Sequence, residues 1–391
     1  MPAECLTLLR TRFLAPGLVL YLVIAVLRGV RGLDQIPSDP GYSAIAQRIG
    51  NPLQLIGFQP YLHSDQLTIA SIAALAPIGF HGLLATLITH VVWAISGAVI
   101  CLSLIRLQIA HWVSYVAGLI LVFCPWAAQS SLGNFGNVRW PILAAVVVMV
   151  ASELVQPKPR IATLLTGSCI AAITNPIAVV VVVPSLVSLL RRHMDSMRHI
   201  VPVAGPVIAV LILNISMNGF GGHGAKVMKL WDGSGLFWSS GVFLPPALAI
   251  TGIVFSLLFL KLRTSIQNLC LMTFASSLAT ALLSYQLGGI ADRYFVTPAV
   301  LSGIGLLVLV NEVTAKYQLR RLLILCSLGL LAFVPSWKWF SVFPYLSNAP
   351  RWSTQVDNAR QFCDGRQSLE FRLITSDGIT ETDPLSCELL E

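Results

Sequence analysis

Long apolar runs separated by short polar segments dominate this chain of 391 residues. A helix needs about 20 mainly apolar residues to cross the hydrocarbon core of a bilayer, so each long run is a candidate membrane span. The pattern predicts spans or shorter membrane helices at 13–29, 83–105, 112–128, 141–156, 161–174, 176–190, 200–217, 241–260, 267–287, 294–312 and 321–336. We therefore expect an all-α fold, a polytopic transmembrane helical bundle of about eleven spans.

Two segments interrupt this simple pattern. Asn175-Pro176 divides the stretch 161–190, and proline both lacks the amide donor and disfavours a helical residue before it. We expect two short helices that meet at Asn175, entering the membrane from the cytoplasmic side and returning to it. The segment 66–80 closes with Pro77 and Gly79, which predicts a short helix at the outer interface or a re-entrant segment.

The composition agrees with a membrane protein. Hydrophobic residues make up 55% of the chain and charged residues 11%, whereas about a quarter of the residues in soluble domains are charged. This excludes a soluble enzyme, a disordered chain, a coiled coil and a nucleic-acid-binding protein. The net charge of +8 does not identify a partner, because short cytoplasmic loops of membrane proteins are basic in any case.

The distribution of basic residues predicts the orientation. With the N-terminus in the cytoplasm, the predicted inside segments hold 13 of the 25 basic residues and four of the 17 acidic ones. The basic residues on that side are Arg10, Arg12, Arg106, Lys158, Arg160, Arg191, Arg192, Arg198, Lys261, Arg263, Lys316, Arg320 and Arg321. This layout follows the positive-inside rule, so we expect a multi-pass protein of the cell membrane with a cytoplasmic N-terminus and an extracytoplasmic C-terminus.

The chain divides into a transmembrane domain, 1–337, and an extracytoplasmic tail, 338–391. The tail is too small to build an independent core without a covalent staple. Cys363 and Cys387 lie in it, and an oxidising compartment would permit a disulfide between them. The alternation of apolar and charged residues over 370–374 predicts a short strand.

The extracytoplasmic side also carries the longer loops, 30–66, 129–139 and 218–240. Functional residues concentrate on loops that a rigid scaffold presents, so we expect the functional site to open outward.

The first outer loop contains the candidate catalytic acids Asp34, Asp39 and Asp65, with His63 close to the last of them. A carboxylate at the outer surface could act as a general base and take a proton from an acceptor hydroxyl. The alternative is that all three are solvated loop acids.

The second outer loop gathers amides, a guanidinium and an indole over a few residues, namely Asn134, Asn137, Arg139 and Trp140. Arginine binds phosphate through paired hydrogen bonds, and Asn and Trp suit sugar hydroxyls and ring faces. The alternative is a tight turn in which Arg139 reaches toward the lipid headgroups.

Further candidate binding residues lie elsewhere. Asn175 is a polar group at membrane depth, although it could simply satisfy backbone groups freed by the proline after it. His223 and Lys226 could bind an anion, or belong to a flexible glycine-rich loop. Arg293 and Tyr294 precede an apolar run, where the arginine could bind a lipid phosphate or form a local ion pair.

Several short motifs, in this order along the chain, resemble those of bacterial polytopic membrane proteins that are similar to C-type (GT-C) glycosyltransferases. They are Tyr61-Leu62-His63 before a segment ending at Pro77, Gly133-Asn134-x-x-Asn137-x-x-Trp140, Asn175-Pro176, and Arg293-Tyr294 with Pro298.

The resemblance implies a GT-C-like fold and transfer of a sugar from a polyprenyl-phosphate carrier to a cell-envelope glycan or glycolipid on the outer face. Asp34, Asp39 or Asp65 would be the base. The implied partners are membrane lipids, the lipid-linked sugar and the envelope acceptor, without nucleic acid. No cofactor is expected, and a divalent metal is left open.

Two other functions remain as alternatives. A transporter or flippase of an amphiphilic envelope precursor also uses broken helices, although ion-coupled carriers usually keep charges within their spans. A non-catalytic envelope assembly protein would use the outer tail for docking. A polar path through to the cytoplasm would favour the carrier, and a first-loop acid facing Arg139 or Arg293 would favour the glycosyltransferase.

Overall fold

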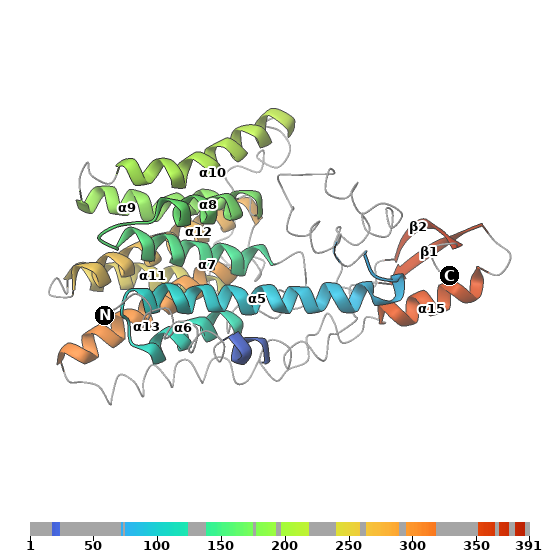
Figure 1. Cartoon of the computed structure of the whole chain (residues 1–391), viewed down its shortest axis with the longest axis horizontal. Coiled ribbons are helices and arrows are strands. Elements are labelled where there is room, and N and C mark those ends of the chain that lie inside the picture. The colour runs from blue at the N-terminus through green and yellow to red at the C-terminus, as the bar shows by residue number, and fades with distance from the viewer. Residues whose placement is uncertain are drawn as a thin grey trace.

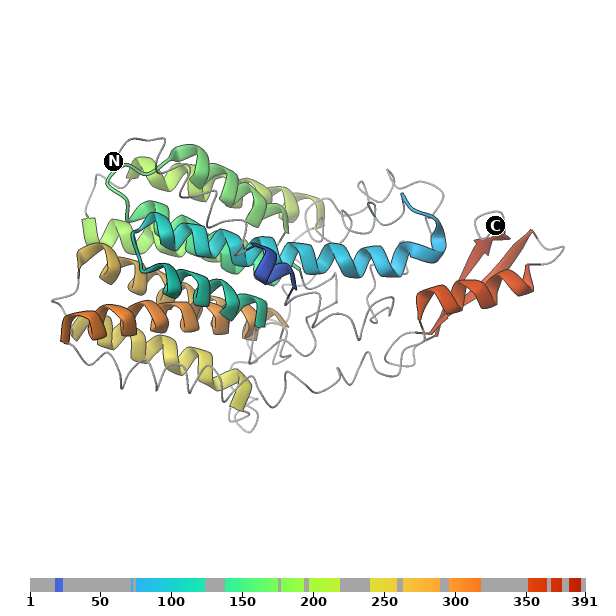
Figure 2. The same ribbon diagram turned by 60° about the horizontal axis from the view of Figure 1, so that its bottom comes forward.

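The protein folds into a helical bundle and a small C-terminal unit (Figure 1). The computed structural model describes residues 18–23, 72, 75–123, 138–174, 177–192, 197–218, 240–258, 263–288, 295–317, 351–363, 367–374 and 380–387. In the bundle the helices run side by side along a common direction, and α5 extends beyond the others toward the C-terminal unit (Figures 1 and 2).

The elements of the bundle follow the predicted apolar runs closely. They are η2 (Ile78–Phe80), α5 (His81–Arg106), α6 (His111–Phe123), α7 (Arg139–Leu154), α8 (Ile161–Thr174), η4 (Ala178–Val182), α9 (Val183–Arg192), α10 (Met197–Asn218), α11 (Ser240–Leu258), α12 (Thr264–Gly288) and α13 (Val296–Tyr317). The predicted run 321–336 and most of the run 13–29 lie outside the described residues. Within the run 13–29, the structure shows a helical segment at 18–23.

Three helices of the described part are long and apolar enough to cross a membrane, judged by length and composition. They are His81–Arg106, Thr264–Tyr285 and Val296–Ala315, with mean hydropathy of 2.1, 1.4 and 1.8. The described part also contains shorter apolar helices of 10–17 residues. The structure therefore has the helical-bundle character of a membrane protein, while the count of eleven spans remains a prediction.

The core of the bundle forms around α7. This helix is rich in valine and small residues, is buried over nearly its whole length, and packs against α5, α8 and α13. A helix that is apolar on all sides is stable only in the interior of a bundle or in lipid.

α8 ends at Thr174 and η4 begins at Ala178, on either side of the predicted break at 175–176. η4 packs back against α8, and α10 then packs along α8. Arg160, just before α8, donates its backbone amide to Glu153 near the end of α7, and Arg191, near the end of α9, bonds to Gln267 and Asn268 at the start of α12. This arrangement matches the predicted pair of short helices that begin and end on the same side.

The structure describes residues 72 and 75–80 of the segment 66–80, so the short helix predicted there lies largely outside the described residues. Pro77 and Gly79 frame the short 3-10 turn η2, in which the Phe80 amide donates to the Pro77 carbonyl at 2.8 Å. The chain then continues directly into α5 at His81. Pro77 comes just before the 3-10 turn that leads into α5, a position where its missing amide donor leaves no helical hydrogen bond unmade.

The C-terminal unit adds a small sheet to the otherwise helical fold. Helix α15 (Trp352–Phe362) is followed by the antiparallel strands β1 (Ser368–Ile374) and β2 (Thr380–Ser386). β1 contains the strand predicted at 370–374. A disulfide joins Cys363 to Cys387, with 5.6 Å between their Cα atoms, and connects the end of α15 to the end of β2.

Candidate functional site

The structure describes four of the predicted site residues. Arg139 and Trp140 open α7, and Cys363 and Cys387 form the disulfide of the C-terminal unit. The remaining predictions lie outside the described residues: Asp34, Asp39, His63, Asp65, Asn134, Asn137, Asn175, His223, Lys226, Arg293 and Tyr294.

Arg139 and Trp140 belong to the first turn of a helix and not to the loop in which they were expected. α7 begins at Arg139, two residues before the predicted span. Pro141 is the third residue of the helix, a position whose amide needs no partner within the helix, so the helix can begin ahead of it. The backbone of Arg139, which carries the guanidinium, therefore belongs to a helix and not to a loop.

Trp140 joins this end of α7 to α13. Its side chain is 3% exposed, and its carbonyl oxygen accepts a hydrogen bond from Thr297 Oγ1 at 2.9 Å. Thr297 is the second residue of α13 and follows Arg293 by four positions in the sequence. The starts of α7 and α13 are thus hydrogen-bonded to each other. Arg139 is the first residue of α7, and Arg293 precedes α13 by three residues in the sequence.

The C-terminal unit docks beyond this same end of the bundle. The rings of Trp352 in α15 and His81 in α5 stack with their centroids 6.4 Å apart, and the indole is fully buried. His81 Nε2 also lies 2.7 Å from the Ala76 carbonyl oxygen. A helix rises about 1.5 Å per residue, so α5 is about 39 Å long and α7 about 24 Å. α5 therefore carries the unit past the start of α7.

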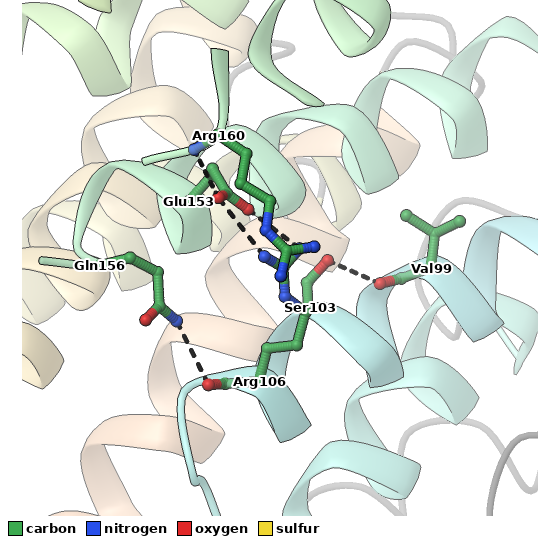
Figure 3. Close-up of polar contacts among 6 residues, drawn as sticks. All are labelled: Val99, Ser103, Arg106, Glu153, Gln156 and Arg160. Carbon is green, nitrogen blue, oxygen red and sulfur yellow. Dashed lines mark hydrogen bonds and ion pairs between the residues drawn. The ribbon is translucent and has the colours of Figure 1, made fainter. Parts of the chain in front are cut away.

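The opposite end of the bundle contains a buried carboxylate, Glu153 (Figure 3). Its side chain is 2% exposed. Its Oε2 lies 2.9 Å from Arg106 Nη1, and its Oε1 accepts the Arg160 backbone amide at 2.7 Å. Gln156 Nε2 donates to the Arg106 carbonyl oxygen at 3.2 Å. Glu153 thus joins the end of α5, the end of α7 and the start of α8.

These contacts offset the free-energy cost of burying the Glu153 carboxylate. A carboxylate removed from water is costly unless a cation and hydrogen-bond donors replace the lost solvent. Arg106 supplies the cation and Arg160 a backbone donor next to a helix start, where amides lack partners within the helix. We interpret the cluster as a structural clasp between helix ends.

A second ion pair closes the same end of the bundle. Arg263, just before α12, donates from Nε and Nη2 to the two carboxylate oxygens of Glu312, each at 2.8 Å. The hydrogen bonds to Glu312 raise the pKa of the Arg263 guanidinium further above its ordinary value. The pair fixes the start of α12 to the last turns of α13.

Arg191 forms a third contact of this kind, but with neutral partners. Its Nε donates to Asn268 Oδ1 at 3.2 Å and its Nη2 to Gln267 Oε1 at 2.7 Å. Gln267 Nε2 then donates to the Ser256 carbonyl oxygen at 2.7 Å. These bonds join the ends of α9 and α11 to the start of α12.

Hydroxyl groups connect the helices inside the bundle. Ser277 of α12 and Ser302 of α13 lie 2.7 Å apart, oxygen to oxygen. Ser277 donates to the Pro298 carbonyl oxygen at 2.8 Å, and Ser302 donates to the Pro245 carbonyl oxygen at 3.0 Å. Such bonds between helices typically stabilise membrane bundles by about 0.6 kcal/mol each.

In the sequence, Glu153 and Arg106 indicated only charges on the inside, and neither their burial nor their pairing was predicted. A signal for Glu153 was present, because it lies within the predicted run 141–156, and a charge in an apolar helix usually faces a partner. The partner itself could not be read from the sequence. Among the described residues, no group of three or more His, Cys, Asp or Glu side chains is arranged to bind a metal.

Comparison of the chain with protein-family models, with curated proteins and with solved structures found no match.

Proposed function

We propose that this protein is an integral membrane glycosyltransferase of the GT-C-like kind. It would transfer a sugar from a polyprenyl-phosphate carrier to a cell-envelope acceptor on the outer face. An eleven-span topology, with a cytoplasmic N-terminus and an extracytoplasmic C-terminal unit, belongs to the same proposal.

The observation that carries the proposal is the position of Arg139 on the first turn of α7, at the end of that helix opposite the buried Glu153. At one end, Glu153 and Glu312 neutralise Arg106 and Arg263 and hold the helix ends together. Arg139 stands at the other end of α7, about 21 Å from Glu153 along the helix. A guanidinium fixed on a first helical turn is suited to hold a phosphate through paired hydrogen bonds.

The position of charges in the longest helices supports a site at the surface of the membrane. The only charged residue of α5 is its last, Arg106, and α12 has none. In α13 the charges are Glu312 and Lys316, both in the last turns. An ion-coupled carrier usually keeps charged residues within its spans. This distribution therefore favours a reaction site at the membrane surface over a transport path through the bundle.

In the proposed reaction, the acceptor hydroxyl oxygen forms a bond to the anomeric carbon of the sugar. The bond from that carbon to the phosphate oxygen breaks, and the polyprenyl phosphate leaves with the electron pair. Asp34, Asp39 or Asp65 takes the acceptor proton. Arg139 and Arg293 hold the phosphate, and Asn134, Asn137 and His63 orient the sugar or the acceptor.

The test uses the full-length protein reconstituted in lipid vesicles with radiolabelled polyprenyl-phosphate sugars and an envelope lipid extract as acceptor. Arg139→Gln removes the guanidinium at the proposed site and is expected to lower transfer at least tenfold, the order of effect of removing a charge-stabilising donor. Lys158→Gln is the matched control, because Lys158 is exposed at the opposite end of the bundle and loses the same charge.

The catalytic base is tested with Asn at Asp34, Asp39 and Asp65 together. Transfer that is unchanged in this triple variant removes the proposed base, and transfer that falls equally in the Arg139 and Lys158 variants removes the proposed phosphate site. Movement of the lipid-linked sugar across the vesicle membrane without a glycosylated product would identify a flippase instead.

A further inference from the structure

Helix α9 is polar on the inside and apolar on the outside. Ser185 and Ser188 are 0% and 2% exposed, whereas Leu186 and Leu190 are 48% and 81% exposed. A surface helix in water shows the opposite pattern, because leucine is stabilised by burial and serine is easily solvated. Leu186 and Leu190 lie one turn apart on the same face, so α9 presents an apolar strip to its surroundings.

Arg191 directly follows this strip, and neutral side chains bind its guanidinium. Its side chain is exposed, yet its guanidinium is held by Asn268 and Gln267, which are 1% and 4% exposed. Arg106 and Arg263, at the same end of the bundle, are neutralised by carboxylates. Within the part of the chain that the structure describes, Arg191 contacts no carboxylate, and the two amides hold its guanidinium in a fixed orientation.

The start of α10 repeats this combination of a cation and an apolar side chain. α10 packs against α9, and four residues separate the two helices in the sequence. Arg198 is exposed and makes no ion pair among the described residues, and Val201, nearly one turn later, is 72% exposed. Within the described residues, two arginines without an ion pair and an apolar surface therefore stand on adjoining helices.

We propose that Arg191, assisted by Arg198, binds the phosphate of an anionic phospholipid whose acyl chain lies along Leu186 and Leu190. The guanidinium has N–H donors beyond those used by the two amides, and it is oriented before the ligand arrives. A soluble phosphate would satisfy the cations but not the leucines, so the surface fits an amphiphile. This inference depends on a membrane location and does not depend on the glycosyltransferase proposal.

The experiment measures lipid retention on the intact protein by native mass spectrometry, in detergent with equal amounts of phosphatidylcholine and phosphatidylglycerol. Wild type is expected to retain phosphatidylglycerol in preference. Arg191→Gln is expected to weaken that retention about tenfold, the loss of one charge-assisted hydrogen-bonded contact. Lys158→Gln removes the same charge from the same end of the bundle and is expected to behave as wild type.

Because Arg191 also holds α9 to α12, a second variant tests the site without touching that contact. Leu190→Gln alters a side chain that is 81% exposed, and it is expected to weaken retention about threefold through the lost apolar contact. If Arg191→Gln does not fold, this variant decides alone. Three results would overturn the proposal: no preference in wild type, equal losses in the Arg191 and Lys158 variants, or displacement of the lipid by glycerol phosphate at equal concentration.

Discussion

At the scale of single residues, the ion pairs of the protein differ in how far they are shielded from water. Glu153 is almost fully buried and is matched by Arg106 and a backbone amide. Asp357 and Arg360 in α15 form an ion pair on side chains that are 64% and 42% exposed. The first pair is shielded from water and the second is not, so equivalent substitutions should have different consequences.

Replacing Glu153 with Ala should lower the free energy of unfolding by about 3 kcal/mol, because Arg106 loses its counter-ion and the Arg160 amide loses its acceptor. Asp357→Ala is the matched control and should change it by less than about 0.5 kcal/mol. Denaturant unfolding of the purified protein in detergent measures both. Similar values for the two variants would show that the Glu153 cluster does not clasp the helix ends.

At the scale of elements, apolar runs predicted the helices well, because the length and hydrophobicity of a run are local properties. The prediction 161–174 coincides with α8, and the break after it separates α8 from η4. The start of α7 was placed two residues late, because its first residue, Arg139, is charged and the aliphatic run begins only after Trp140. A helix start depends on backbone hydrogen bonding more than on hydrophobicity.

The contacts between helices could not be predicted in the same way. Nothing in the sequence around Ser277 or Thr297 indicates that they bond to Pro298 and Trp140, because these partners are chosen by tertiary packing. For the candidate site, the sequence pointed to Arg139 and Trp140, and the structure adds that they stand on a helix joined to α13. The pairing of Glu153 with Arg106 depends on the approach of α7 to α5, which a single sequence does not encode locally.

Phe274, a fully buried side chain of α12, makes another contact between helices that the sequence does not predict. Its ring lies against Gly252 of α11 and Gly305 of α13, and a Cβ atom at Gly252 would overlap the ring. Gly252→Ala should therefore lower the free energy of unfolding by about 1–3 kcal/mol, the usual effect of overpacking. Thermal unfolding in detergent measures the change.

Gly205 of α10 is the control for this prediction, because a Cβ there meets no atom within 4 Å. Gly205→Ala should leave the stability within about 1 kcal/mol of wild type. Adding Phe274→Leu to Gly252→Ala should recover part of the loss, because the smaller side chain leaves room for the methyl group. Equal effects of the two glycine variants, without recovery, would mean that Phe274 is not confined by Gly252.

At the scale of the whole molecule, α5 connects two chemically different ends. Its last residue, Arg106, forms an ion pair with Glu153 at one end of the bundle, which we call the clasped end. Its first residue, His81, stacks on Trp352 of the C-terminal unit. In the described part, Lys158, Arg160 and Arg191 are exposed at the clasped end, while the disulfide lies in the unit at the far end. A basic face suits the cytoplasm and a disulfide suits an oxidising compartment, so the two ends should lie on opposite sides of the membrane.

Labelling with a membrane-impermeant maleimide tests this asymmetry directly. Lys158→Cys and Asp357→Cys each place a thiol on an exposed position, one at each end of the molecule. In a background whose unpaired cysteines are replaced by serine, intact cells should label the Asp357 variant, whereas the Lys158 variant should react only after the membrane is permeabilised. Labelling of both variants in intact cells, or of neither, would place the two ends on one side. The predicted orientation, on which the glycosyltransferase proposal depends, would then be wrong.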